Sequence, residues 1–271
     1  MANEFRESLE GLLAGLSSRA LPVAGVWTAV PGGESYRAVA LAGAAGPAFQ
    51  PFRNWLWSRE LPVRAVGQFL PSSGTGQVAV DDLLFSAQAL AWSREAGATA
   101  CVMLRVAGNA LAFLALFAAP QAAANVEARL PEAAAATADV LAAIRERTGA
   151  AEGLERYPLL ADHEDDVVYA FRFLPEPRFE YVSASVERLV GYTPEDHYRD
   201  PDLGLKLVHA DDRALIESLR AGGIGPSRFV ARWLRRDGVV VRTEHRVTPL
   251  FSIEGEVVAL EGVARARPLG G

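Results

Sequence analysis

Three long runs of strand-like sequence lie close together near the C-terminus and limit the folds that are open to the chain. Together with two shorter runs before them, they occupy residues 167–173, 179–182, 228–235, 239–251 and 256–264. Between the two groups, short helix-like segments are separated by Gly, Pro and Asp. This order predicts an antiparallel sheet flanked by helices.

The longest run has the two-residue period of a strand with one covered face. In residues 239–248, one set of alternate positions carries three charged side chains, so the other set, with Thr243 and His245, is expected to face inward. Aromatic residues on the neighbouring runs complete an apolar cup with few polar groups, the usual composition of a ligand site. The predicted site contains Tyr169, Phe171, Tyr192, Phe229, Trp233, Thr243 and His245. A backbone carbonyl or Tyr192 could instead satisfy the buried polar groups.

Short sequence motifs in the C-terminal half resemble those of the PAS sensor domain. Residues 181–195 (YVSASVERLVGYTPE) are similar to the PAS segment Y-V-N-x-A-x-x-x-L-x-G-Y-x-x-E-E. Residues 209–213 (HADDR) resemble its H-P-D-D-R, and residues 235–238 (RRDG) its R-x-D-G hairpin. The resemblance implies a sensory domain with a pocket for a small molecule.

The first half shows a different order of elements. Expected elements are a helix at 3–19, strands at 23–30 and 36–42, a short helix at 52–61, a strand at 61–66, a helix from Asp81 to Glu95, strands at 99–106 and 110–117, and an Ala-rich helix at 122–147 that Pro131 should interrupt. Residues 96–106 (AGATACVMLRV) and 108–117 (GNALAFLALF) resemble two strands of the GAF domain. In that family, the region of Trp55 and Trp57 caps a ligand pocket. A roadblock-type fold has a similar order of elements.

These patterns predict an α+β protein of two domains, each an antiparallel sheet flanked by helices. The predicted boundaries are 1–150 for the GAF-like domain, 151–162 for a linker and 163–268 for the PAS domain. A length of 271 residues agrees with about two domains.

Composition excludes several classes of function. A net charge of -6 gives no reason to expect nucleic acid. The N-terminus lacks the basic and apolar regions of a signal peptide, and no apolar run approaches the ~20 residues that span a bilayer. A single cysteine, Cys101, allows no intramolecular disulfide and no cysteine cluster for zinc. We expect a cytoplasmic protein without contacts to membranes.

The polar motifs favour structural roles over chemistry. Glu164, Asp165 and Asp166 could bind a cation, but solvated residues before a strand are the better interpretation. Asp211 and Asp212 are expected to cap a helix, as are Thr193 and the proline after it. No catalytic constellation is present, so we predict no enzyme activity. No covalent bilin or flavin attachment is predicted either, because the PAS-like half has no cysteine and Cys101 lies in an apolar strand.

The resemblance implies a module that senses and transmits a signal, as part of a two-component or cyclic-dinucleotide system. It would bind a small ligand, a protein partner or both, and control an effector domain or a separate signalling protein. A scaffold for protein interaction with no small-molecule ligand is the alternative. The apolar stripes of helices 3–19 and 122–147 suggest a homodimer, although both stripes could instead cover the sheet of their own chain.

Overall fold

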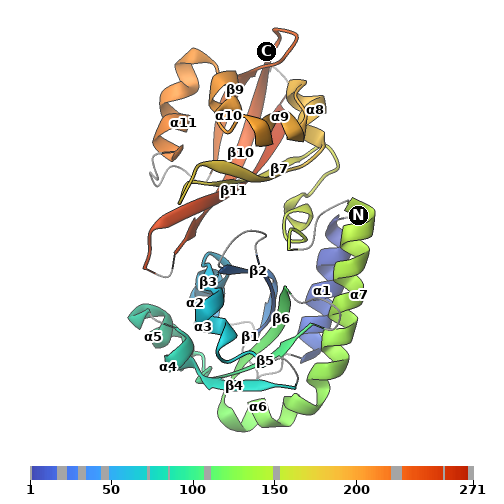
Figure 1. Ribbon diagram of the computed structural model, residues 1–271, viewed down its shortest axis with the longest axis vertical. Coiled ribbons are helices and arrows are strands. Elements are labelled where there is room, and N and C mark those ends of the chain that lie inside the picture. The colour runs from blue at the N-terminus through green and yellow to red at the C-terminus, as the bar shows by residue number, and fades with distance from the viewer. Residues whose placement is uncertain are drawn as a thin grey trace. The chain divides into compact units, whose positions relative to one another are not determined.

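The computed structural model describes residues 2–16, 23–29, 35–43, 49–71, 74–84, 86–106, 111–148, 153–220, 228–252 and 254–267. The chain divides into two compact units, Asn3–Leu159 (unit 1) and Leu160–Gly271 (unit 2), shown in Figure 1. Each unit contains an antiparallel sheet flanked by helices, which confirms the predicted fold class. In the described part of the chain, no helix combines the length and apolar character needed to span a bilayer.

The sheet of unit 1 has the strand order β3-β2-β1-β6-β5-β4, and its neighbouring strands are antiparallel. The strands are β1 (Val23–Ala29), β2 (Ser35–Gly43), β3 (Leu61–Pro62), β4 (Gly76–Ala79), β5 (Ala100–Arg105) and β6 (Ala112–Ala118). Because its central strands are buried on both faces, they are almost continuously apolar.

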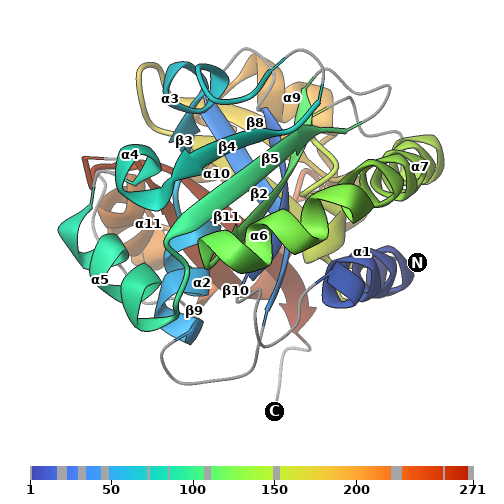
Figure 2. The same cartoon turned by 90° about the horizontal axis from the view of Figure 1, so that it is seen from below.

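Two helical layers cover the two faces of this sheet (Figures 1 and 2). One layer is α1 (Ala2–Leu16) and α7 (Leu130–Thr148), whose Leu9 and Leu141 pack in one cluster with Leu114 and Leu116 of β6. The other layer contains α2 (Phe49–Trp57), α3 (Val63–Gly67), α4 (Val80–Leu83) and α5 (Ala87–Glu95). Alternate residues of β1 and β6, such as Trp27, Phe113 and Phe117, belong to this second core.

The apolar stripe of α1 is therefore used within the chain. Phe5, Leu9, Leu13 and Leu16 are all buried, and they pack in the same cluster as residues of β1, β2 and β6. This packing accounts for the stripe, so the stripe no longer argues for the homodimer, which stays a prediction.

Several predicted elements of unit 1 differ in detail. The strand predicted at 61–66 is only two residues long, because α3 begins at Val63. The helix predicted from Asp81 to Glu95 is two helices, and the second begins anew where the Ser86 side chain accepts a hydrogen bond from the Ala89 N–H. As predicted, the helical segment is interrupted near Pro131. The first helix, α6 (Pro120–Val126), ends there, the 3-10 turn η1 (Glu127–Arg129) follows, and α7 begins at Leu130. Residues 31–33 and 108–109, which separate the paired strands expected from the sequence, lie outside the described residues.

The described part of the predicted linker, 153–162, begins as a packed segment of unit 1. Arg156 and Tyr157 are each 1% exposed. Arg156 donates hydrogen bonds to the backbone carbonyls of Ala38 and Trp57, and Arg37 donates to the Tyr157 hydroxyl. Residues 153–159 thus belong to the compact unit before them.

The sheet of unit 2 has the order β8-β7-β11-β10-β9, again antiparallel throughout. Its strands are β7 (Val167–Arg172), β8 (Arg178–Val182), β9 (Arg228–Leu234), β10 (Val240–Phe251) and β11 (Val257–Arg267). The helices α8 (Ser185–Val190), α9 (Pro194–Arg199), α10 (Leu203–Leu207) and α11 (Arg213–Arg220) follow β8, and η2 (Pro158–Leu160) and η3 (Ala210–Asp212) are short 3-10 turns. Apolar residues of α8 and α10 pack against β7 and β11 in one core cluster.

Local sequence explains where two of these helices begin and end. Thr193 caps α9: its hydroxyl accepts from the Asp196 N–H at 3.2 Å, and the Asp196 carboxylate accepts from the Thr193 N–H at 3.1 Å. Gly191 ends α8 with φ of 80°, a left-handed conformation that favours glycine. The predicted cap at Thr193 is therefore confirmed.

The prediction that Asp212 caps a helix is wrong. Its carboxylate accepts from the backbone N–H of Arg232 at 2.7 Å and from the guanidinium at 3.0 and 2.8 Å. Asp212 therefore ties the turn before α11 to β9. The side chain that caps this turn is that of His209, which accepts a hydrogen bond from the Asp211 N–H.

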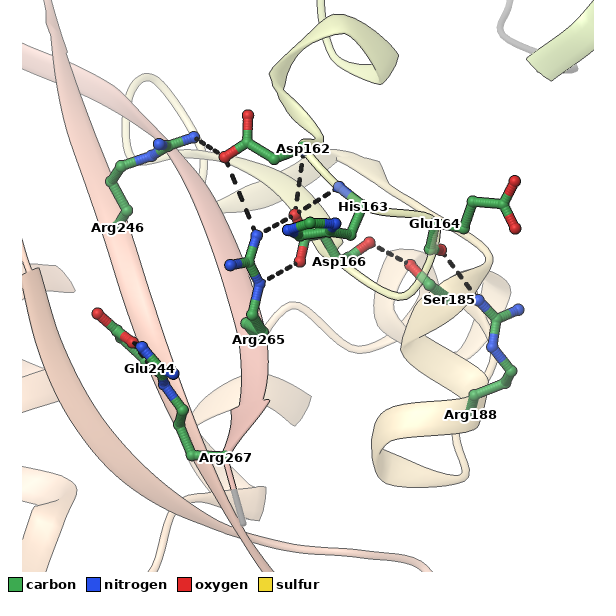
Figure 3. A network of polar contacts seen from close by, with 10 residues as sticks. All are labelled: Asp162, His163, Glu164, Asp166, Ser185, Arg188, Glu244, Arg246, Arg265 and Arg267. Carbon is green, nitrogen blue, oxygen red and sulfur yellow. Dashed lines mark hydrogen bonds and ion pairs between the residues drawn. The ribbon is translucent and has the colours of Figure 1, made fainter. Parts of the chain in front are cut away.

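Asp166 was predicted to be solvated, and this is also wrong. Its side chain is fully buried, and its carboxylate accepts two hydrogen bonds from the Arg265 guanidinium, at 2.7 and 2.8 Å (Figure 3). The backbone N–H groups of Asp162 and His163 donate to the same carboxylate. Burial by itself raises the pKa of Asp166, but these hydrogen bonds outweigh it and hold the pKa below its usual value. The segment before β7 is thereby fixed to β11.

Candidate functional site

A cavity of about 110 Å³ lies inside unit 2, between the inner face of its sheet and its helices. Since one buried water needs roughly 10–15 Å³, the cavity has room for a small organic molecule. It is lined by Val167, Tyr169, Phe171, Phe173, Phe179, Val182, Val186, Leu189, Val190, His197, Gly204, Leu205, Ile216, Phe229, Trp233, His245, Val247, Leu260 and Ala264. Among these described residues there is no Asp, Glu, Lys or Arg.

The alternation predicted for β10 places the inward face as expected. Thr243, His245 and Val247 are 0%, 3% and 6% exposed, while Arg242 and Arg246 on the other face are exposed. The register shift of β10 falls at Leu250/Phe251, beyond the site, so it does not reverse the inward and outward positions. Val239, predicted to begin this face, is 56% exposed and precedes the strand.

His245 lies at the centre of an aromatic cluster. Its ring stacks on Phe229 with 4.7 Å between centroids and on Trp233 with 5.5 Å. Its Nδ1 is 3.1 Å from the Tyr169 hydroxyl, and its Nε2 is 3.1 Å from Trp233 Nε1 and 2.7 Å from Thr243 Oγ1. Burial lowers the pKa of His245 to about 3, so the ring is neutral near pH 7.

These contacts determine which ring nitrogen of His245 carries the proton. Trp233 Nε1–H can only donate, so it requires a lone pair on His245 Nε2. The proton of the neutral ring is then on Nδ1 and is donated to the Tyr169 hydroxyl oxygen. The Tyr169 hydroxyl proton remains available for another acceptor.

A glycine on the adjacent strand makes room for Tyr169. Gly262 of β11 pairs with Tyr169 of β7, and a Cβ added to Gly262 would lie 2.1 Å from Tyr169 Cζ and 2.4 Å from its hydroxyl oxygen. The tyrosine ring therefore lies directly over Gly262. No local sequence signal marks this glycine, since it lies within an apolar strand and its pairing depends on the strand order.

Thr243 belongs to the polar cluster but does not line the cavity. With the His245 proton on Nδ1, the Thr243 hydroxyl donates to His245 Nε2 at 2.7 Å, and its oxygen lies 3.1 Å from the Ala231 carbonyl oxygen. The buried polar groups of β10 thus find partners within the chain, which was the alternative to a ligand partner.

Tyr192 is not brought to the cavity. Its ring packs at the edge of the core of α8 and β7, and the Arg236 guanidinium lies 5.5 Å from its centroid. The hydroxyl partner of His245 is Tyr169. Tyr192 was predicted as a possible partner of the buried polar groups, but the side chain that reaches His245 comes from β7.

Trp55 and Trp57 of α2 line neither of the two cavities described here, both of which belong to unit 2. Trp55 is buried in the core with Phe52 and Leu56. Trp57 is half-buried, and the Arg156 guanidinium lies 4.0 Å from its ring centroid. Cys101, which the sequence placed in an apolar strand, is fully buried, and burial raises the pKa of its thiol.

Sequence reasoning missed His197 of α9, which lines the cavity and is 4% exposed. Its Nδ1 lies 2.9 Å from the Thr193 carbonyl oxygen, so Nδ1 carries a proton and donates it. Burial lowers the pKa of His197, although the Thr193 carbonyl opposes the shift. The signal was available: the predicted cap at Thr193 fixes the helix, and a residue four positions later lies over the cap.

A second cavity, of about 260 Å³, lies on the other side of the same sheet. It is lined by Asp162, Arg228, Glu244, Arg246, Val263, Arg265 and Arg267, part of the network in Figure 3. Arg267 pairs with Glu244, and Arg246 lies 3.4 Å from Asp162. Across the described residues, no group of His, Cys, Asp and Glu is arranged to hold a metal ion.

Comparison with known proteins agrees with the fold of unit 2. A family model described as the PAS fold matches residues 179–264. The helices after β8 and the strands β9 and β10 lie within this segment, so residues 179–264 have the PAS fold. No curated protein matches the chain.

Solved structures similar to this chain come from several microbes. The N-terminal domain of a diguanylate cyclase with a PAS/PAC sensor from Marinobacter aquaeolei is 21% identical, with a TM-score of 0.33, covering 37% of this chain and 94% of that chain. A sensory box histidine kinase/response regulator from Burkholderia thailandensis is 19% identical, with a TM-score of 0.29 and coverage of 38% and 76%. A PAS domain from Colwellia psychrerythraea is 18% identical, with a TM-score of 0.31 and coverage of 39% and 89%.

Proposed function

We propose that the chain is a sensory module whose PAS-fold unit binds a small molecule and passes the signal to an effector. The observation that carries this proposal is the cavity of about 110 Å³, which is apolar apart from a few hydrogen-bonding groups. A cavity of this kind beside a tyrosine hydroxyl with an unused proton is suited to bind a ligand rather than to catalyse a reaction.

Unit 1 is proposed to be a GAF-like domain. Its support is the element order, helix, two strands, short helices, strands and a closing helix, together with the sequence of β5 and β6. A role of Trp55 and Trp57 in a ligand pocket is part of this proposal, which a ligand-bound structure would test.

The output is proposed to be a kinase, a cyclase or another signalling protein that the module controls in the cytoplasm. The homodimer is retained as a proposal. Light scattering of the full chain at high micromolar concentration measures it directly, and a monomer would contradict it.

The second candidate function is a scaffold that binds no small molecule. It is favoured by one observation: His245 and Thr243, the polar groups predicted to need a ligand, have partners inside the chain. In that case the cavity would hold water or stay empty.

Analysis of co-purified molecules distinguishes the two functions. The full chain is purified, denatured and extracted, and the extract is compared by mass spectrometry with that of Ala264→Leu, whose larger side chain extends into the cavity. We expect a small molecule in the native protein that is depleted in Ala264→Leu and retained in Val239→Leu, a change at an exposed position. The absence of any specific molecule, together with no binding of added small molecules, would favour the scaffold.

A further inference from the structure

The walls of the cavity restrict the charge of what can bind. No acidic or basic side chain is among its described lining residues, and both of its histidines are kept neutral by burial. A charged group placed there would lose its hydration without gaining a partner of opposite charge, which costs far more than a hydrogen bond returns. The cavity therefore selects uncharged molecules.

One wall offers a hydrogen-bond donor. The direction of donation runs from Trp233 Nε1–H to His245 Nε2 and from His245 Nδ1–H to the Tyr169 hydroxyl oxygen. Both rings and the tyrosine line the cavity, and the Tyr169 proton has no acceptor in this chain of hydrogen bonds. Burial raises the pKa of Tyr169, so the proton stays on its oxygen.

A second wall offers an acceptor. Since His197 Nδ1–H donates to the Thr193 carbonyl, the neutral ring presents a lone pair on Nε2. Among the described residues, Nε2 receives no hydrogen bond, although the side chain is more than nine-tenths buried. A ligand with an N–H or O–H group that reaches this lone pair would form a hydrogen bond there that the chain itself does not supply.

We infer that the ligand is an uncharged, mostly apolar molecule that accepts a hydrogen bond from the Tyr169 hydroxyl and donates one to His197 Nε2. This inference rests on the proposed function of the cavity as a ligand site. It specifies the chemical class: a compact, neutral body with one acceptor atom and one donor group.

A set of probes with one aromatic body tests the inference on the full chain. Ethylbenzene has neither polar group, acetophenone has an acceptor, 4-aminoacetophenone has an acceptor and a donor, and 4-acetylbenzoate adds a negative charge. Calorimetric titration should show affinity rising from ethylbenzene to acetophenone to 4-aminoacetophenone, by roughly two- to ten-fold at each step for one neutral hydrogen bond. We expect no measurable binding of 4-acetylbenzoate.

Two substitutions show which residue is responsible for each gain in affinity between successive probes. Tyr169→Phe should lower the affinity for acetophenone to that for ethylbenzene, whereas Tyr192→Phe, outside the cavity, should change nothing. His197→Phe should remove the advantage of 4-aminoacetophenone over acetophenone, whereas His163→Phe, at an exposed position, should preserve it. Because the order of the probes is measured on the native protein, the test does not depend on the folding of either variant.

Each contrary result has a defined meaning. Binding of 4-acetylbenzoate as tight as that of acetophenone would overturn the exclusion of charge. Equal affinities of Tyr169→Phe and the native protein for acetophenone would overturn the donor role. If no neutral probe binds but a co-purified molecule is found, the inferred class is wrong and the sensory function survives. If neither is found, both fail.

Discussion

The protonation of His245 should make the stability of unit 2 depend on pH in a mildly acidic range. The unfolded histidine takes up a proton near pH 6.5, whereas the buried ring does so only near pH 3. Between these values the unfolded chain holds more protons, so the free energy of unfolding falls as the pH is lowered from 6.5 toward 3. At pH 5 the loss from His245 should be about 2 kcal/mol.

Hydrogen exchange of the β10 amides at pH 7 and pH 5, corrected for intrinsic rates, measures this loss in the full chain. His245→Phe should reduce the difference in stability between the two pH values, whatever its effect at pH 7. His197 contributes with the same sign, because burial also lowers its pKa. An unchanged pH difference in His245→Phe would show that the ring is not the titrating group.

Gly262 should be intolerant of a side chain, because Tyr169 occupies the space above it. The added methyl group of Gly262→Ala would overlap the tyrosine ring, so the free energy of unfolding should fall by about 1–3 kcal/mol. Urea unfolding of the full chain measures the change. In a Tyr169→Ala background the same substitution should cost little, and equal costs in both backgrounds would refute the proposed overlap.

At the scale of elements, one buried carboxylate joins the segment before β7 to the last strand. Asp166→Ala removes hydrogen bonds to Arg265 and to two backbone N–H groups, and it should lower the free energy of unfolding by about 2–3 kcal/mol. This loss is at the lower end of the free energy that breaking a buried ion pair costs, because the Arg265 side chain is 40% exposed and can be hydrated once its partner is removed.

The neighbouring acid is the matched control. The Asp165 side chain is 91% exposed and pairs with an exposed Arg188, so Asp165→Ala should change stability by less than about 0.5 kcal/mol. Chemical unfolding of the two variants under identical conditions compares them. Equal effects would mean that the buried hydrogen bonds of Asp166 contribute no more than a surface ion pair.

At the scale of the whole molecule, unit 2 should fold by itself. Its strands, its helices and the residues of its core clusters all lie within 160–271. A fragment of residues 160–271 should therefore unfold cooperatively in urea, as monitored by circular dichroism. A fragment that begins at residue 167 lacks Asp166 and should be less stable; a non-cooperative transition in the longer fragment would contradict independent folding.

The sequence by itself determined the features that depend on near neighbours. The inward face of β10, with Thr243 and His245, followed from a period of two residues, and the cap at Thr193 followed from the residues beside it. The PAS fold of residues 179–264 was predicted from the order of elements and several short motifs. These features need no knowledge of distant contacts.

Only the tertiary structure decided the polar partners. Asp166 meets a guanidinium 99 positions away, and Tyr169 meets His245 across 76 positions. Periodicity shows which face a residue occupies, but not which strand lies beside it or in which register. The prediction placed Tyr192 at the site and overlooked His197, and both errors have the same cause. The packing of the helices over the sheet decides which side chains reach the cavity, and that packing depends on the whole core.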